Sequence, residues 1–183
     1  MYDPLTTDLL GYPQLAGIDA HLKRYLASDA AKQPMGEQDQ HLFTLFAGLA
    51  NSHPAYTYVS LGTEQGGYVF WPGDPNLSRY DPRTRPWYKA AMAQPGKTLR
   101  TDAYYWAADD AVLVSTVRSF ANQLGASGGV VNIDVSLKQL TELVKQIKLG
   151  ETGYLMLLEN TGTVLVDPKQ PEHNFKALNS LGE

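Results

Sequence analysis

Residues 80–88 concentrate chemically useful side chains, with two arginines, one carboxylate and three aromatic rings in nine residues. Two prolines stiffen the segment, because each fixes its own φ and pushes the residue before it toward extended geometry. A stiff loop that presents a guanidinium fork beside aromatic faces can hold a small anion or zwitterion. In the alternative interpretation, the arginines pair with carboxylates such as Asp81 and the aromatic rings belong to the core.

Later in the chain, three side chains suggest a place for a ligand cation: those of Tyr104, Trp106 and Asp134. Tyr104 and Trp106 stand two residues apart, so in a strand both would point to the same face. Aromatic faces attract cations most strongly where water is excluded, although the same rings could simply be core. Asp134 follows an apolar strand sequence, where a carboxylate must find a donor or a cation. It could neutralise a ligand ammonium, or it could cap the helix that follows.

The sequence lacks the usual catalytic and metal-binding patterns. The four histidines stand far apart without an HxxH or HExxH pairing, and the chain has no cysteine. No GxSxG motif supplies a nucleophile elbow, and the glycines near residue 65 lack the GK[ST] end of a phosphate loop, so they predict a turn. We therefore expect no enzyme, no metal site and no cofactor. A hydrolase would need a nucleophile–base pair that the sequence does not offer.

The composition is typical of a folded globular chain, since 43% of the 183 residues are hydrophobic and 19% are charged. The formal net charge is −4 and the basic residues do not cluster, which argues against nucleic acid as a partner. No apolar run approaches the roughly 18 residues of a membrane span, and the N-terminus does not resemble a signal peptide. The chain could nevertheless be a piece of a membrane protein, because an excised domain would have the same composition.

Hydrophobic periodicity predicts a mixed order of helices and strands. Apolar spacing predicts a helix over residues 17–29 and a second helix over 42–49. Pro86 suits the first turn of a short third helix. A fourth helix begins at Ser136, which would form a capping box with Gln139. The predicted strands are residues 55–61, 67–71, 112–120, 129–135, 154–159 and 163–166.

Four blocks of sequence, taken together and in order, resemble the double Cache (dCache) sensor domain: residues 80–88, 101–104, 129–137 and 150–154. Such domains form the extracytoplasmic part of bacterial chemoreceptors, sensor histidine kinases and diguanylate cyclases. The ordered set is specific, whereas any single block would be weak. The resemblance implies a non-enzymatic sensor domain, with a chemoreceptor as the first choice for the whole protein and a histidine kinase or diguanylate cyclase as the alternative.

The resemblance also implies an α+β fold of PAS-like modules, each an antiparallel sheet flanked by helices. Residues 1–39 would be a helical segment belonging to a stalk helix, and residues 40–135 the membrane-distal module with the ligand pocket. Residues 136–150 would connect this module to the start of a smaller membrane-proximal module, residues 151–183. The domain would be periplasmic, in a protein anchored in the inner membrane, and the resemblance leaves a homodimer open.

The family pattern for amino-acid binding can be carried over residue by residue. The positions that match those holding a ligand carboxylate are Tyr80, Arg85 and Trp87. Tyr104 and Asp134 match positions that hold the ligand ammonium. The pattern has an acidic residue two positions after that tyrosine, where this chain has Trp106. Because an indole attracts cations by a cation–π interaction, this difference favours a quaternary amine, such as a betaine, or another amine as the ligand. An amino acid-like ligand remains an option. Further alternatives are a nucleobase stacked on Trp106, or no small-molecule ligand, with side chains filling the pocket.

Overall fold

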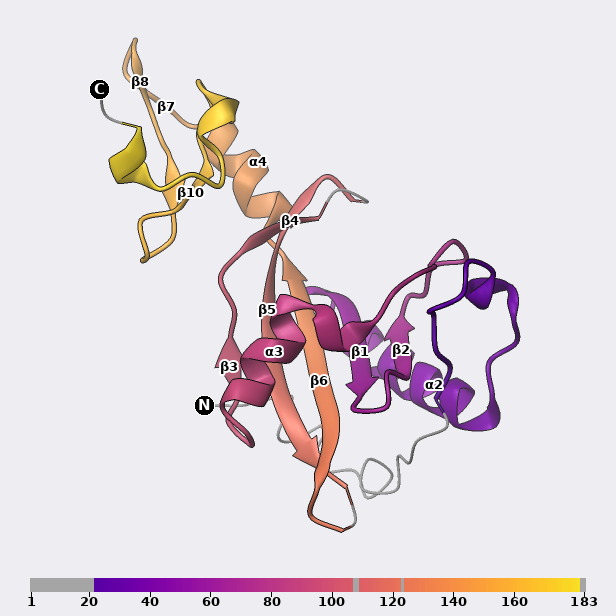
Figure 1. Cartoon of the computed structure of the whole chain (residues 1–183). Coiled ribbons are helices and arrows are strands. Elements are labelled where there is room, and N and C mark those ends of the chain that lie inside the picture. Colours follow the sequence, from indigo (N-terminus) through magenta and orange to yellow (C-terminus); the bar gives the residue numbers. More distant parts are fainter. Residues whose placement is uncertain (1–21, 107–108, 123, 182–183) are drawn as a thin grey trace. The chain divides into compact units, whose positions relative to one another are not determined.

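The computed structural model describes residues 22–106, 109–122 and 124–181 (Figure 1). The chain divides into two compact units. The first contains Met1–Thr101 and Ser115–Asp134, and the second contains Asp102–Val114 and Val135–Glu183. The module boundaries expected from the sequence stay a prediction.

An antiparallel sheet carries the architecture, and the strand order is β2-β1-β6-β5-β3, with β4 also paired to β5. Its strands are β1 (Tyr56–Thr63), β2 (Tyr68–Trp71), β3 (Leu99–Arg100), β4 (Tyr104–Trp106), β5 (Ala111–Ala121) and β6 (Ser127–Ser136). Strands β1 and β2 form a hairpin in which Ser60 lies opposite Phe70. The predicted α+β fold with an antiparallel, Cache-like sheet is confirmed.

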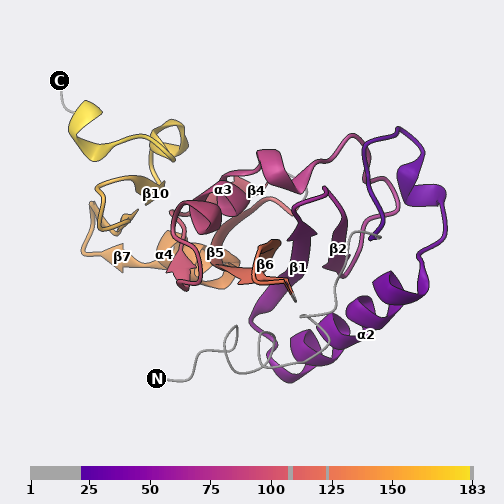
Figure 2. The same ribbon diagram turned by 60° about the horizontal axis from the view of Figure 1, so that its bottom comes forward.

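Two helices of the first unit lie on opposite faces of the sheet, α2 (Glu37–Ser52) on one and α3 (Pro86–Ala93) on the other (Figures 1 and 2). Helix α2 buries Leu42, Phe46 and Leu49, which recur at helical spacing, against alternate residues of the strands. Side chains in a strand alternate between faces, so the intervening residues point toward α3. The predicted helices over 42–49 and after Pro86 are confirmed, although α2 begins earlier than predicted.

The helix predicted over residues 17–29 is wrong for its described part, because residues 22–29 contain no α-helix. This segment instead runs beside β2, where the Tyr68 amide donates to the Lys23 carbonyl at 2.9 Å and the Tyr80 amide to the Tyr25 carbonyl at 2.8 Å. Leu22 and Tyr25 enter two different core clusters. Burial of both residues and coverage of the sheet edge outweigh a helical spacing that local sequence favours. Residues 17–21 lie outside the described part.

The second unit contains helix α4 (Lys138–Gln146) and short strand pairs: β7 (Lys148–Leu149) with β8 (Gly153–Tyr154), and β9 (Leu157–Leu158) with β10 (Val164–Val166). Its buried cluster is small and consists of Val144, Leu165 and Val166. The predicted strand over 154–159 is therefore broken into two shorter pieces. The second predicted strand, 163–166, is confirmed as β10.

The capping box predicted for the fourth helix is wrong. Leu137 holds the N-cap position without a side-chain hydrogen bond, and Ser136 Oγ accepts from the Lys138 amide at 3.1 Å. The Leu137 amide donates to the Val112 carbonyl at 2.8 Å, which ties the residue after β6 to β5 and keeps it outside the helix. The helix consequently begins later than its local sequence suggests.

Candidate ligand-binding site

The loop over residues 80–88 has a conformation that its own sequence dictates. Asp81 caps a 3-10 turn, η3 (Pro82–Thr84), by accepting from the Arg83 amide at 3.0 Å. Pro82 and Pro86 each occupy a first-turn position, where the missing N–H costs nothing. Arg85, in extended geometry, joins η3 to α3 and serves as the N-cap residue of α3. The loop is thus rigid around Arg85.

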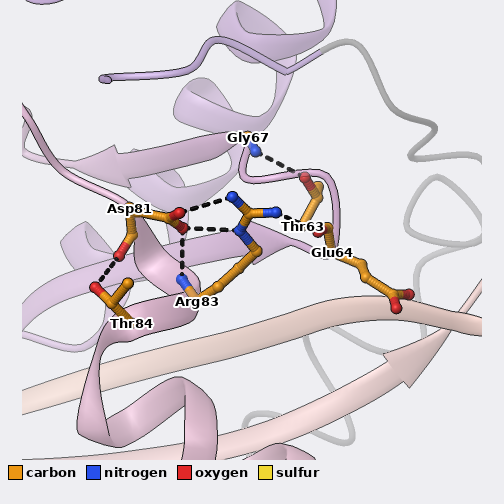
Figure 3. Close-up of polar contacts among 6 residues, drawn as sticks. All are labelled: Thr63, Glu64, Gly67, Asp81, Arg83 and Thr84. Atoms are coloured by element: carbon orange, nitrogen blue, oxygen red, sulfur yellow. Dashed lines mark hydrogen bonds and ion pairs between the residues drawn. The ribbon is translucent and has the colours of Figure 1, made fainter. Parts of the chain in front are cut away.

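Arg83 is bound within the protein (Figure 3). Its Nη2 lies 2.7 Å from Asp81 Oδ2 and its Nε 2.9 Å from Asp81 Oδ1, while Nη1 donates to the Glu64 carbonyl at 3.3 Å. The hydrogen bonds and charge of Arg83 hold the pKa of Asp81 below its ordinary value against the opposing effect of burial. Arg83 therefore ties the loop to the β1–β2 turn, and it forms the ion pair with Asp81 that the alternative interpretation expected of both arginines.

Arg85 has different surroundings. Its guanidinium carbon lies 4.3 Å from the centre of the Tyr80 ring, a cation–π contact. Arg85 forms no ion pair with any described residue, and its buried Nε has no hydrogen-bond partner among them. A half-buried guanidinium with unused donors can receive a carboxylate.

Aromatic rings surround Tyr80. The ring of Tyr68 lies 4.6 Å from that of Tyr80 and 6.3 Å from that of Trp87, and all three residues are buried in one cluster. Burial raises the pKa of Tyr80, hydrogen bonds with Tyr68 and Trp87 and the charge of Arg85 lower it, and the charge of Asp134 raises it. The Tyr80 hydroxyl is therefore within electrostatic reach of both a cation and an anion.

Asp134 lies on β6 and is 5% exposed. Ser115 Oγ donates to its Oδ1, and Asn132 Nδ2 donates to its Oδ2 at 2.9 Å. The alternative in which Asp134 caps the next helix is wrong, since the N-cap is Leu137. The carboxylate belongs to the sheet face that α3 covers, because Val130, four residues earlier on the same strand, joins the Tyr80 cluster.

Hydrogen bonds connect Asp134 through Asn132 to Ser60, since Asn132 Nδ2 also points to Ser60 Oγ at 3.4 Å. Burial is the largest cause that raises the pKa of Tyr68, while Tyr80 raises it further and Ser60 lowers it. Sequence reasoning missed Ser60, Tyr68 and Asn132; of these only Asn132 had a local signal, because it stands two residues before Asp134 on the same strand and so shares its face.

Tyr88 is a further residue that sequence reasoning did not single out. It is buried on α3, its ring lies 5.6 Å from that of Trp87, and its hydroxyl has no hydrogen-bond partner among the described residues. Burial, foremost, and the charge of Glu64 raise the pKa of Tyr88 to about 12, with smaller contributions from Arg83 downward and Asp81 upward.

Tyr104 and Trp106 belong to the second unit, on β4, opposite Leu113 and Ala111 of β5. Trp106 is 38% exposed, and Tyr104 is partly buried. The first unit thus brings together Tyr80, Arg85, Trp87 and Asp134, and the other two predicted residues are not part of it. In the part of the chain that the structure describes, no three metal-ligating side chains gather, and no helix is long and apolar enough to cross a membrane.

Comparison with known proteins gives a consistent result. The ligand-binding domain of the chemoreceptor PctC from Pseudomonas aeruginosa, in complex with GABA, has a TM-score of 0.63 and 26% sequence identity, and the match covers 85% of this chain and 68% of that one. The corresponding domain of PctB with L-Gln has a TM-score of 0.60 and 29% identity over 85% of this chain and 62% of that one. The complete PctB, a methyl-accepting chemotaxis protein, is 35% identical over 147 residues.

The fold and these likenesses define the class as a Cache-type ligand-binding domain. The model of the methyl-accepting chemotaxis protein-like first PDC sensor domain matches residues 36–142, more than half of the chain. The chain belongs to this family of chemoreceptor sensor domains, as the resemblance implied. It spans 22% of the length of PctB, although the match includes 80% of this chain.

Proposed function

We propose that this domain senses a small zwitterion for a membrane-bound chemoreceptor, with the ligand held on the α3 side of the sheet. In this proposal the guanidinium of Arg85, with Tyr80 and Trp87, receives the ligand carboxylate, and Asp134 receives the ammonium. Tyr104 and Trp106 remain assigned to the site by the sequence resemblance alone. The domain would lie outside the cytoplasm, as in chemoreceptors that detect extracellular nutrients.

The observation that carries the proposal is the guanidinium of Arg85, whose buried Nε has no hydrogen-bond partner among the described residues. The guanidinium lies against the Tyr80 ring and forms no ion pair with any described residue. A buried donor without a partner costs free energy, which a ligand carboxylate would offset. A zwitterion would bring that carboxylate together with a cation for the Asp134 side of the site.

The relatives support an amino acid as the ligand class. PctC was crystallised with GABA and PctB with L-Gln, and both ligands carry one carboxylate and one ammonium. Amines without a carboxylate would leave the Arg85 side unused. A quaternary amine such as a betaine, in contrast, would retain the carboxylate and would depend on aromatic faces for its cation.

The test is a binding screen of the 183-residue chain with L-amino acids, GABA, betaines, amines and nucleobases, first by thermal shift and then by calorimetry. For the best ligand, Arg85→Gln and Asp134→Asn should each weaken binding by about 10-fold or more, since each removes a charge-assisted contact. Arg100→Gln is the matched control, because it changes the same residue type at an exposed position on β3 and should leave affinity within about threefold. Unchanged binding in both site variants would refute the residue assignment.

A further inference from the structure

Asn132 has a buried acceptor that the protein itself does not use. The residue is 2% exposed, and its Oδ1 has no hydrogen-bond partner among the described residues. Both hydrogen bonds of the side chain are made by the other end of the amide, from Nδ2 to Asp134 at 2.9 Å and to Ser60 at 3.4 Å. A buried acceptor without a partner is costly, and in native proteins it is uncommon without a functional reason.

The neighbours of Asn132 fix the orientation of its amide. The Asp134 carboxylate offers acceptor oxygens, so the amide nitrogen must face it. The contact with Ser60 Oγ at 3.4 Å is made by the same amide nitrogen. If the amide were reversed, its oxygen would face the Asp134 carboxylate oxygen 2.9 Å away, and neither oxygen could donate. The free acceptor is thus Oδ1, on the sheet face that carries Asp134.

We propose that Asn132 is a specificity-determining residue of this site, and that its Oδ1 selects a ligand cation bearing N–H groups over a quaternary ammonium. This inference rests on the proposed function and narrows its ligand class. A primary ammonium has three N–H donors and can bond to Asp134 and Asn132 together. A trimethylammonium group has none, so it would keep its charge attraction to Asp134 but leave Oδ1 unpaired and without water.

The expected size of the affinity difference follows from one property of buried hydrogen bonds: leaving a buried acceptor unpaired costs more free energy than the bond itself contributes. A site built to bond a donor rejects an analogue lacking that donor more strongly than a purely apolar site rejects one extra methyl group. For a single neutral acceptor we expect at least about 10-fold weaker binding. Because the trimethyl group is also larger, the experiment must separate lost hydrogen bonding from lost space.

The experiment measures calorimetric affinities of the 183-residue chain for two series: L-alanine with its N-methyl, N,N-dimethyl and N,N,N-trimethyl derivatives, and GABA with the same derivatives. Wild-type protein should bind the primary amine of at least one series about 10-fold or more tightly than its trimethyl derivative. Asn132→Leu, which keeps the side-chain volume but removes the acceptor, should reduce this ratio to below about threefold. Ser119→Ala, which removes a buried hydroxyl from the neighbouring strand β5, should preserve the ratio of primary-amine to trimethyl affinity.

The possible outcomes distinguish failure of the role inferred for Asn132 from failure of the proposed function. Equal or tighter binding of the trimethyl derivative by the wild type overturns the inference and leaves the proposed function intact. The same holds if Asn132→Leu retains the full preference, since the preference would then come from space. Asn132→Ala replaces the leucine variant if the latter does not fold. If no amino acid or betaine of the initial screen binds the wild type, the zwitterion proposal fails and the inference fails with it.

Discussion

At the scale of single residues, the buried hydroxyl of Tyr80 is the group on which several other side chains of the site act. Tyr68, Trp87 and the charges of Arg85 and Asp134 all influence its pKa, and the Arg85 guanidinium lies 4.3 Å from the centre of the Tyr80 ring. Tyr88, one residue beyond Trp87, has an equally buried ring but a hydroxyl without a partner among the described residues. The same tyrosine-to-phenylalanine substitution can therefore be compared at a hydroxyl that interacts with neighbouring polar groups and at one that does not.

We expect Tyr80→Phe and Tyr88→Phe to differ in their effect on the free energy of unfolding at neutral pH. Tyr80→Phe should lower it by about 1–3 kcal/mol, because the buried polar groups of Tyr68 and Trp87 lose their interaction with the Tyr80 hydroxyl. Tyr88→Phe should change it by less than about 0.5 kcal/mol or raise it slightly, because no hydrogen bond within the described structure is lost. Urea unfolding of the ligand-free proteins measures both. A larger loss in the Tyr88 variant would contradict the assigned hydrogen bonds.

Tyr88 also makes a prediction about alkaline stability. Its pKa in the folded protein is raised to about 12, chiefly by burial, whereas an unfolded tyrosine titrates near 10. Between these values the unfolded state loses its proton first, so the stabilising contribution is complete below about pH 10 and is lost as the pH rises toward 12. Tyr88→Phe should remove about 1 kcal/mol of the stability loss between pH 9 and pH 11. Identical pH profiles of the two proteins would refute the raised pKa.

At the scale of elements, the site depends on how closely the 80–88 loop approaches β1. Arg83 ties the loop to the turn after β1 (Figure 3), and Gly62 on β1 lets it come near. A Cβ at Gly62 would lie 2.7 Å from Pro82 Cβ and 3.2 Å from the Trp87 ring. Glycine is therefore required here for space, and the position of Trp87 depends on it.

Alanine substitution at two glycines should act in opposite directions. Gly62→Ala should lower the free energy of unfolding by about 1–3 kcal/mol through overpacking, and it should weaken ligand binding because Trp87 must move. Gly48→Ala, in the middle of α2, places a Cβ that meets nothing within 4 Å. It should raise stability by about 0.5–1 kcal/mol by favouring the helix. Chemical unfolding measures the two stabilities, and calorimetry measures ligand affinity. Stabilisation by Gly62→Ala would contradict the close approach of the 80–88 loop to β1.

At the scale of the whole molecule, the two units differ in how much apolar surface they bury. The first unit has two clusters of ten buried residues each, on the two sides of its sheet. The second has a cluster of three and strand pairs of two or three residues. Several of its leucines are at least 38% exposed: Leu140, Leu143, Leu149, Leu155, Leu158 and Leu178. Isolated two-stranded sheets are marginally stable.

Hydrogen exchange should therefore separate the units. Amides of β9 and β10 should exchange at least about 100-fold faster than those of β1 and β6, because a small buried cluster opens at low free-energy cost. Mass spectrometry of the exchanged 183-residue chain, with peptides covering each strand, measures the difference. Comparable protection across all strands would show that the chain opens as a single cooperative unit.

Local chemistry explains why part of the site could be predicted. The 80–88 loop is set by residues in contact along the chain: two prolines, the Asp81 cap and an ion pair between residues two positions apart. The start of α3 at Pro86 and the alternating strands both follow from residue type and spacing, whereas the ligand role of Arg85 comes from the family resemblance and stays a prediction. The four-block resemblance likewise led to the family that the comparisons show.

Only the tertiary structure decided the features whose partners are distant in sequence. Asn132 meets Ser60 across 72 positions and Asp134 meets Ser115 across 19, so no local pattern marks them as one network. Residues 22–29 abandon a helical spacing because burial beside β2 is worth more than local propensity. The sequence thus determined the rigid loop around Arg85, while the fold decided which buried polar groups face it, because hydrogen-bond partners across a sheet are selected by strand register.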